Sequence, residues 1–358
     1  MVRSRRSPKI VVVTGASAGV GRAAALAFAR AGADVALLAR DEQALAEVAE
    51  IARGYGVRAL PIAADMSSAQ AVDTAADRIE NELGPIDVWV NNAMVTMFSP
   101  VSRMTHDEFA RITDVTYLGY VWGTMAALRH MSRRDKGVIV QVGSALAYRA
   151  IPLQSAYCGA KYAIRGFTDA LRCELLHDKS NIRVTMVQMP ALNTPQFDWA
   201  ASRMPGAPRP VAPVYEPEVA AQAIAWAAAH PRRELHVGLS SIKAIVANKF
   251  APGYLDRYLA KRAFRAQQRD SATDPEHAVD LWHPVPGMHR LRGSFSGEAK
   301  SSCASLWVDT HRGATLGALV ALGLGAFALL SRRKANAQDD AENAGSTPRA
   351  QFGGTGNT

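Results

Sequence analysis

The 358-residue sequence predicts an α/β fold, a doubly wound parallel sheet of about seven strands followed by a C-terminal helical extension. Between residues 9 and 240, short apolar runs alternate with longer alanine- and leucine-rich segments, which is typical of strand–helix–strand units. A glycine-punctuated segment joins the first run to the first helix. Hydrophobic residues make up 48% of the chain and charged residues 20%, which fits a globular protein with a full core.

Seven apolar runs predict the strands. The first is strongly β-branched, because Val11, Val12 and Val13 stand side by side in it. The later runs have the same short length, and each is followed by turn residues or by a polar segment of helical pattern. We expect these strands at residues 9–14, 33–40, 58–63, 85–93, 137–143, 182–190 and 234–240.

The segments between the runs predict crossover helices. The first is rich in alanine, the second carries its charges on one face, and the fourth is unusually long. These helices are expected at residues 20–31, 41–53, from 68 onward, 107–132, 155–176 and 217–229.

The segment TGASAGVG at residues 14–21 places glycines at the entry to the first helix. Glycine permits a tight turn and lets the backbone approach a pyrophosphate, whose charge is then stabilised by the helix N-terminus. The spacing is G-x-x-x-G-x-G, which differs from the standard G-x-G-x-x-G fingerprint of dinucleotide-binding folds. This loop alone is weak support for a nucleotide site.

A second group of polar residues lies between residues 144 and 161. Tyr157 and Lys161 are four residues apart, so on a helix they share one face. A free tyrosine titrates near pH ~10, and a neighbouring lysine cation favours its phenolate form, which predicts a lowered tyrosine pKa. Ser144 ends a predicted strand and could hydrogen-bond a substrate oxygen. The competing interpretation is a helix that carries an incidental tyrosine and lysine.

Taken together, TGASAGVG at 14–21, NNA at 91–93, Ser144 thirteen residues before Tyr157 and YCGAK at 157–161 resemble the short-chain dehydrogenase/reductase family, over about residues 8–240. The resemblance implies a Rossmann-like fold, a nicotinamide cofactor, and hydride transfer between the cofactor and an alcohol or carbonyl. It also implies that Ser144, Tyr157 and Lys161 are catalytic.

The sequence departs from the family pattern at two positions near the site. Met94 replaces the usual glycine after NNA, and Thr116 replaces the asparagine that holds a water in the family's proton relay. Threonine keeps a hydroxyl but lacks the two amide donors. We therefore place Thr116 among the catalytic residues as an altered relay position.

The resemblance further implies a set of nucleotide contacts, with Thr194 facing the nicotinamide carboxamide. Asp65 matches the family position that reads the adenine amino group, although capping the helix from 68 onward is an alternative role. The implied contacts are Thr14, Gly15, Ser17, Gly19, Val20, Gly21, Asp65, Asn92, Ala93, Tyr157, Lys161, Pro190 and Thr194.

Arg40 ends the second predicted strand, where such folds meet the adenosine ribose. A guanidinium is suited to a phosphate dianion, whereas an acidic residue would accept hydrogen bonds from a free 2′-hydroxyl. Arg40 therefore favours NADP over NAD. The alternative is a solvated arginine at the start of the next helix.

Two stretches lie close to where a substrate is expected. Residues 195–217 are proline-rich and contain Phe197, Trp199 and Met204, which suggests either a cover over an apolar substrate or core packing. Residues 241–312 begin with basic helical segments and continue irregularly. The basic segments fit a membrane surface, or a lid on the active-site mouth.

The formal net charge of +9 is concentrated in an N-terminal arm at residues 1–8 and in the basic segments after residue 240. No zinc finger, aromatic stacking platform or recognition-helix signature accompanies it, so we expect no nucleic-acid partner. The three cysteines form no C-x-x-C pair, so we expect neither a metal site nor a disulfide framework.

Residues 313–330 form an uncharged run of eighteen, GATLGALVALGLGAFALL, followed by a polar, glycine-rich tail at 331–358 that we expect to be disordered. A helix of that length spans about 27 Å, enough to cross a thin hydrocarbon core, so we expect one transmembrane helix. The basic cluster after the span would place the catalytic domain outside the cell, but the cofactor and the lack of a signal peptide favour the cytoplasm.

These observations predict a single-pass membrane oxidoreductase that prefers NADP(H) and interconverts a secondary alcohol and a carbonyl on a small hydrophobic substrate. Association into a homo-oligomer stays open. The main alternative is a catalytically weak nucleotide-binding sensor or scaffold on the same fold. An isomerase or epimerase that regenerates its cofactor in each turnover is a third hypothesis.

Overall fold

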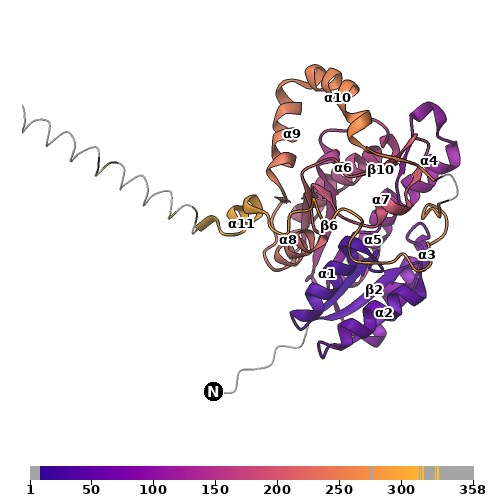
Figure 1. Ribbon diagram of the computed structural model, residues 1–358. Coiled ribbons are helices and arrows are strands. Elements are labelled where there is room, and N and C mark those ends of the chain that lie inside the picture. Colours follow the sequence, from indigo (N-terminus) through magenta and orange to yellow (C-terminus); the bar gives the residue numbers. More distant parts are fainter. Residues whose placement is uncertain are drawn as a thin grey trace, which may run out of the picture. The chain divides into compact units, whose positions relative to one another are not determined.

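The computed structural model of the protein describes residues 9–274, 277–313, 315, 317, 327 and 329. Within this part of the chain, one compact unit ends at Leu306 and a second begins at Trp307. The first unit holds the sheet, its covering helices and most of the C-terminal extension (Figure 1). The short helix α11 (Ala304–Thr310) spans the boundary between the two.

The first unit is built on a seven-stranded parallel sheet, as the sequence predicts. Its strand order is β12-β7-β6-β4-β1-β2-β3, so the chain moves outward from β1 in one direction and then fills the other side. The reversal between β1 and β4 creates a crevice at the carboxyl ends of these strands, where such sheets bind ligands. The strands are β1 (Ile10–Thr14), β2 (Asp34–Ala39), β3 (Ala59–Ala63), β4 (Ile86–Asn91), β6 (Val138–Ser144), β7 (Arg183–Met189) and β12 (Glu234–His236).

Helices cover both faces of the sheet (Figure 1). Alternate residues of β1 enter different cores: Val11 and Val13 pack with α1, α2 and α8, whereas Ile10 and Val12 pack with α3 and α5. This alternation is why a strand buried on both faces reads as a continuous apolar run. The covering helices are α1 (Gly19–Arg30), α2 (Glu42–Arg53), α8 (Pro217–Ala229), α3 (Ala69–Glu82), α4 (His106–Thr113), α5 (Gly119–Met131) and α6 (Ser155–His177).

The long helix expected at 107–132 is not continuous. A π-helical turn at Asp114–Leu118 separates α4 from α5. Thr116, within this turn, exchanges two hydrogen bonds with the backbone of Val95: its Oγ1 donates to the carbonyl at 2.9 Å and accepts from the amide at 3.1 Å. Such turns bulge a helix locally and often occur at functional sites.

The last strand is shorter than expected. β12 ends at His236, and Gly238 turns the chain with a φ of +83° into α9 (Leu239–Phe250). Strand residues have a negative φ, so the predicted strand cannot continue through Gly238. A second basic helix, α10 (Pro252–Ala266), follows and projects with α9 from one side of the unit (Figure 1).

The part of the extension that follows the basic helices was expected to be irregular, but it contains the end of β13 (Gln268–Ala272) and the helix α11. Strand β13 pairs antiparallel with β10 (Gly206–Pro208), which ties the extension to the proline-rich segment. Two further short ladders and a short helix lie in or beside the proline-rich segment, outside the extension: β5 (Met97–Phe98) with β9 (Ala201–Ser202), β8 (Ala191–Leu192) with β11 (Val214–Tyr215), and α7 (Gln196–Trp199).

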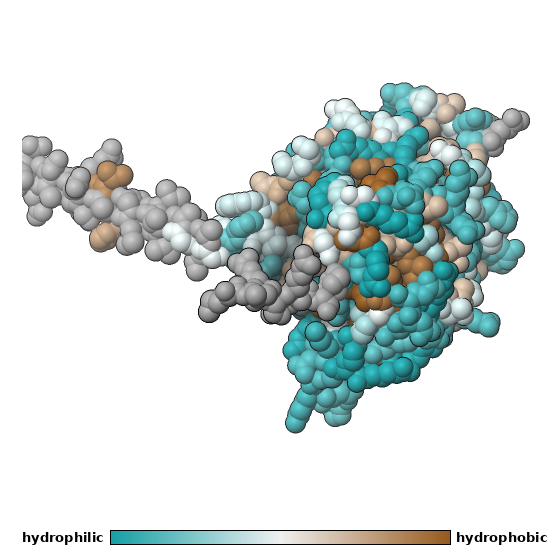
Figure 2. Space-filling model, turned by 90° about the horizontal axis from the view of Figure 1, so that it is seen from below, coloured by the Kyte–Doolittle hydropathy of each residue, from teal (hydrophilic) through white to brown (hydrophobic). Residues whose placement is uncertain are grey.

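The arm at 1–8, most of the predicted span at 313–330 and the tail at 331–358 lie outside the described residues. Among the residues that are described, no helix is both long and apolar enough to cross a bilayer. Viewed from below, the described surface is mainly hydrophilic, and hydrophobic residues show mostly in a hollow near its middle (Figure 2).

Candidate active site

The structure brings Ser144, Tyr157 and Lys161 to one cavity at the carboxyl end of the sheet. Ser144 ends β6, is 7% exposed, and its Oγ accepts a hydrogen bond from the amide of Leu146 at 3.1 Å. Tyr157 and Lys161 lie one turn apart on α6. A rigid strand end and a helix therefore present the three functional groups to the same space.

Lys161 is buried, with 2% of its surface exposed. Its Nζ donates to the hydroxyl oxygen of Tyr120 at 3.0 Å and to the carbonyl of Val142 at 2.9 Å. The same Nζ lies 5.6 Å from the ring centroid of Tyr157. The ammonium is thus fixed between α5, β6 and Tyr157.

Sequence reasoning missed Tyr120. The Tyr120 hydroxyl donates to the carbonyl of Val142 at 3.0 Å and accepts from Lys161, so it completes a closed triangle of polar atoms. A signal was available, because Tyr120 follows Thr116 by four residues and such residues share a helix face.

Thr116 forms no hydrogen bond with Lys161. Both polar contacts of the Thr116 hydroxyl go to Val95, in the loop that follows β4. The threonine therefore holds the loop beside the site, and Tyr120 takes the place next to the lysine.

The prediction that the lysine lowers the pKa of Tyr157 is wrong for this structure. Burial raises the pKa of Tyr157 well above its usual value, and the Ser144 hydroxyl opposes that rise. Burial also lowers the pKa of Lys161 to about 7. The reason is that both groups lose water together, which disfavours the charged form of each.

The glycine turn sits beside this cavity and lines a groove with the ends of β1, β2 and β4. Gly15 has a φ of +67° and a Cβ there would lie 2.8 Å from Ala93 Cα, while a Cβ on Gly21 would lie 2.0 Å from the Gly15 carbonyl oxygen. Only glycine fits these two positions. Helix α1 begins without a side-chain cap, which leaves its N-terminus suited to an anion.

Two side chains fix the turn to β4. Thr14 Oγ1 accepts from the amides of Asn92 at 2.9 Å and Ala93 at 3.1 Å, and Asn92 Nδ2 donates to the Thr14 carbonyl at 2.9 Å. The NNA segment is therefore a positioning element for the glycine turn. These residues fit a dinucleotide pyrophosphate approaching the backbone at Gly19.

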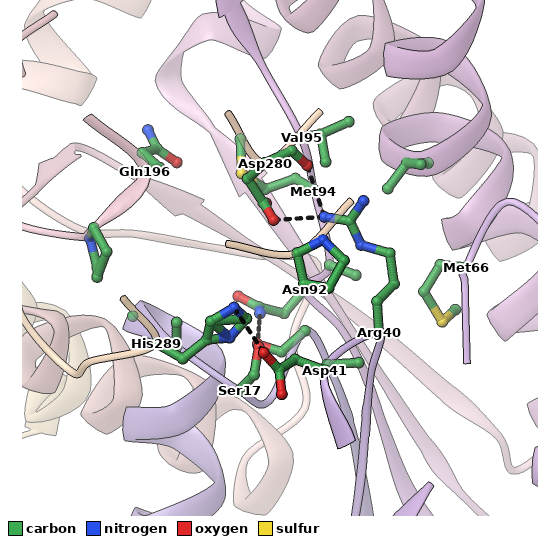
Figure 3. Close-up of a pocket in the computed structure, with 18 of the residues that line it drawn as sticks. Ser17, Arg40, Asp41, Met66, Asn92, Met94, Val95, Gln196, Asp280 and His289 are labelled. Carbon is green, nitrogen blue, oxygen red and sulfur yellow. Dashed lines mark hydrogen bonds and ion pairs between the residues drawn. The ribbon is translucent and has the colours of Figure 1, made fainter. Parts of the chain in front are cut away.

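Arg40 lies at the far end of the groove, where the sequence places it. Its Nη2 contacts Asp280, an unexpected partner from the extension, at 2.7 Å from both Oδ1 and the backbone carbonyl (Figure 3). The alternative of a solvated arginine is wrong, because the Arg40 side chain is only 16% exposed.

Asp65 does not cap the following helix, since Ser68 caps α3 through the amide of Ala71. The Asp65 carboxylate instead pairs with Arg111 at 2.7 Å and accepts from the Ser67 amide at 2.9 Å. Hydrogen bonds from Arg111 and Ser67 outweigh burial and lower the pKa of Asp65. The carboxylate lines the groove in its ionised form.

The cavity that holds the Ser–Tyr–Lys group has a volume of about 340 Å³. Val20, Asn92, Met94, Thr194 and Gln196 line both this cavity and the groove, so the two spaces adjoin. Of the remaining sequence-predicted nucleotide contacts, Gly15, Ser17, Gly19, Arg40, Asp65 and Ala93 line the groove, and Pro190, Tyr157 and Lys161 line the cavity.

Comparison with known proteins agrees with this geometry. A family model described as short chain dehydrogenase matches residues 9–203. The uncharacterized oxidoreductase YxnA of Bacillus subtilis (strain 168) is 31% identical over 326 residues, which cover 90% of this chain and 91% of that protein.

Solved structures give the same result. A short-chain dehydrogenase from Streptomyces avermitilis is 26% identical with a TM-score of 0.60, covering 72% of this chain and 95% of that one. An alcohol dehydrogenase from the archaeon Thermococcus sibiricus, complexed with 5-hydroxy-NADP, is 27% identical with a TM-score of 0.57, covering 64% and 96%. This chain is therefore an oxidoreductase that belongs to the short-chain dehydrogenase/reductase family.

Proposed function

We propose that the protein is an NADP(H)-preferring oxidoreductase that interconverts a secondary alcohol and a carbonyl on a hydrophobic substrate at a membrane surface. The observation that carries the proposal is the meeting of Ser144, Tyr157 and Lys161 in a cavity that adjoins the glycine-turn groove. A nicotinamide dinucleotide in the groove would present its reactive end to that cavity and would supply or accept the hydride.

Three side chains would handle the substrate oxygen. Tyr157 keeps its proton at neutral pH, because burial raises its pKa, so it is poised to donate that proton to a carbonyl oxygen as the alcohol forms. Ser144 lies at a strand end, where its hydroxyl can hydrogen-bond the same oxygen. Lys161 is held by Tyr120 and Val142 and supports the phenolate that remains.

The walls of the cavity favour an apolar substrate. A cavity of about 340 Å³ falls in the usual range for small-molecule sites. Its apolar lining comes from several elements, including the proline-rich segment and α10: Ile151, Met189, Leu192, Phe197, Val211 and Leu259. The segment that was expected to cover the substrate does contribute Phe197 to this wall, whereas Trp199 lines the groove.

NADP(H) is favoured by Arg40, whose guanidinium stands at the end of β2 and faces the groove. A 2′-phosphate can accept two charge-assisted hydrogen bonds from such a group. The Thermococcus sibiricus relative, whose structure contains 5-hydroxy-NADP, is consistent with this choice.

Membrane association is supported by α9 and α10. These helices expose large apolar side chains, among them Phe250 at 79%, Tyr254 at 68% and Val246 at 50%. Basic residues accompany them in the sequence: Lys243, Lys249, Arg257, Lys261, Arg262 and Arg265. Apolar and basic groups together fit an anionic lipid surface, and the uncharged run at 313–330 would anchor the chain with its catalytic unit in the cytoplasm.

The catalytic proposal is tested by Tyr157→Phe, assayed by NADPH oxidation with a panel of hydrophobic ketones and aldehydes. We expect kcat to fall by about 10²–10⁴-fold, with little change in the NADPH dissociation constant. Tyr162→Phe, on the exposed side of the same helix, is the matched control. If Tyr157→Phe kept most of the activity, the assignment would be wrong, and NADPH binding without turnover of any substrate would favour the sensor alternative.

The membrane proposal is tested by co-sedimentation of the full chain with anionic and neutral vesicles. A Phe250→Ser, Tyr254→Ser double variant should bind anionic vesicles more weakly than the wild type. Phe109→Ser, which removes an exposed aromatic residue from α4, is the control. If the double variant bound anionic vesicles as well as Phe109→Ser did, α9 and α10 would not be the membrane-binding surface.

A further inference from the structure

Residues 280–293, here termed the strap, run along the dinucleotide groove and contact both of its phosphate-binding ends. At one end, Arg40 Nη2 donates to Asp280 Oδ1 and to the Asp280 carbonyl at 2.7 Å each, and Nη1 donates to the Leu281 carbonyl at 3.4 Å. At the other end, the Gly19 amide donates to the carbonyl of Arg290 at 3.1 Å. Each contact is made by an oxygen of the strap.

The middle of the strap forms part of the wall of the groove. His289 Nε2 lies 3.5 Å from Asp41 Oδ2 (Figure 3). The His289 ring centroid lies 5.4 Å from that of Trp199, and the His289 carbonyl accepts from Arg22 at 2.7 Å. Asp280, Pro284 and His289 line the groove together with the glycine turn. The strap therefore forms one wall of the groove and bonds Arg40 and Gly19 at its two ends.

The two ends of the groove are the two places where a phosphorylated dinucleotide needs donors. A 2′-phosphate needs the guanidinium of Arg40, and a pyrophosphate needs amides at the start of α1. In this structure the Asp280 carboxylate takes the first donor and the Arg290 carbonyl takes the second. The strap thus reproduces the acceptor pattern of the ligand for which the groove is built.

We propose that the strap is a built-in competitor of the nucleotide, in which Asp280 stands in for the 2′-phosphate and the Arg290 carbonyl for a pyrophosphate oxygen. Nucleotide binding then requires the strap to leave the groove. The observed dissociation constant equals the intrinsic constant divided by the fraction of molecules with the strap released, so weakening the strap tightens binding. This inference rests on the proposed use of NADP(H).

The ion pair between Asp280 and Arg40 can be broken at a low cost in free energy. Burial raises the pKa of Asp280 to about 6 although Arg40 and Arg111 lie beside it, and nearby Asp65 adds to the rise. Desolvation therefore offsets much of the attraction between Asp280 and Arg40. A phosphate dianion, which carries more charge and more acceptor oxygens than a carboxylate, can replace it.

Two substitutions release the strap by different physical means. Asp280→Asn removes the charge that faces Arg40 and keeps the shape of the side chain. Gly293→Ala adds a Cβ that would lie 2.5 Å from the Thr194 carbonyl oxygen, which forces the strap away from its anchor. The matched controls lie in the same extension: Asp256→Asn breaks a 2.7 Å ion pair with Arg149 outside the groove, and Gly297→Ala adds a Cβ in open space.

The experiment titrates the full chain with NADPH and with NADH and follows nucleotide fluorescence. We expect Asp280→Asn and Gly293→Ala each to bind both nucleotides about tenfold more tightly than the wild type, because the strap must leave for either one. The two controls should match the wild type. Unchanged or weakened binding in both strap variants would overturn the proposal, as would tightening confined to NADPH, which would indicate a contact at Arg40 alone.

Hydrogen–deuterium exchange of the wild type gives an independent readout. Saturating NADPH should protect residues 14–21 and accelerate exchange in residues 280–290. Protection of both segments would indicate that the strap closes over the bound nucleotide, which would contradict the proposal that it competes with the nucleotide. Tighter nucleotide binding by the strap variants without turnover of any carbonyl substrate would support the strap and contradict the proposed function, whereas turnover with unchanged binding would do the reverse.

Discussion

Tyr120 and the carbonyl of Val142 hold Lys161 Nζ between them, at 3.0 and 2.9 Å. All three groups are buried, so each depends on the others for its hydrogen bonds. At the residue scale, the position and the hydrogen bonds of Lys161 therefore depend on two buried neighbours, Tyr120 and Val142.

Removing the Tyr120 hydroxyl should slow catalysis without weakening nucleotide binding. In Tyr120→Phe, Lys161 keeps only the Val142 carbonyl, so we expect kcat to fall by about tenfold, which corresponds to the loss of one hydrogen bond to a charged group. The pH at which kcat is half-maximal should also shift, because the Lys161 ammonium loses the hydroxyl oxygen that accepts its hydrogen bond. Steady-state kinetics across pH, with the NADPH dissociation constant measured alongside, checks this.

Thr116→Val provides the contrast. Thr116 bonds the backbone of Val95 and not Lys161, so its loss should lower the free energy of unfolding by about 1–3 kcal/mol and leave the pH profile of kcat in place. Urea unfolding and the same kinetic series measure both effects. A shifted pH profile in Thr116→Val would place Thr116 in the relay after all.

At the scale of elements, the strand–turn–helix unit from β1 to α1 depends on the absence of side chains. The Cβ of Gly21→Ala would lie 2.0 Å from the Gly15 carbonyl oxygen, so the turn must deform. We expect the free energy of unfolding to fall by about 1–3 kcal/mol and nucleotide binding to weaken. Urea unfolding and NADPH titration give the two values.

Gly166→Ala, in the middle of α6, is the control for the same chemical change. Its Cβ would meet open space, and alanine favours a helix over glycine by about 1 kcal/mol. We therefore expect this variant to be slightly more stable than the wild type. If both glycine variants behaved alike, the close contact at Gly15 would not be what restricts the turn.

The regular elements were predictable because each depends on local pattern. The seven strands and their crossover helices follow from apolar periodicity, and the strand and helix that carry Ser144, Tyr157 and Lys161 follow from spacing. Tyr120 and Asp280 were not found, because their roles arise from contacts across the chain: Asp280 lies 240 residues from Arg40. The shortened β12 and the pairing of β13 also depend on tertiary context, which overrides local preference.

At the scale of the whole molecule, the buried lysine makes stability depend on pH. Burial holds the pKa of Lys161 at about 7, below its ordinary value of 10.5. Between these values the unfolded chain binds the extra proton, so the free energy of unfolding rises with pH from about 7 to 10.5, and this gain is lost as pH falls back to about 7.

Lys161→Met should remove this dependence, because methionine does not titrate. The Tyr120 hydroxyl can still donate to the Val142 carbonyl, at 3.0 Å in the wild type, so these two groups keep a hydrogen bond in the variant. Relative to this variant, the wild type should gain at most about 1.4 kcal/mol per pH unit between pH ~7.5 and ~9.5. Urea unfolding at several pH values measures it, with Lys243→Met as the surface control. Parallel pH curves for wild type and Lys161→Met would contradict the buried titration.

The strap is attached to the rest of the unit near both of its ends. Before it, β13 pairs with β10, and at its end the Gly293 amide donates to the Asn193 carbonyl at 3.2 Å. A segment attached in this way has a fixed effective concentration at its binding site, which its own length sets. In the proposed competition, diluting the enzyme would therefore not change the fraction of closed straps, whereas raising the concentration of free dinucleotide would. The fraction of active enzyme would then depend on the dinucleotide concentration and not on the enzyme concentration.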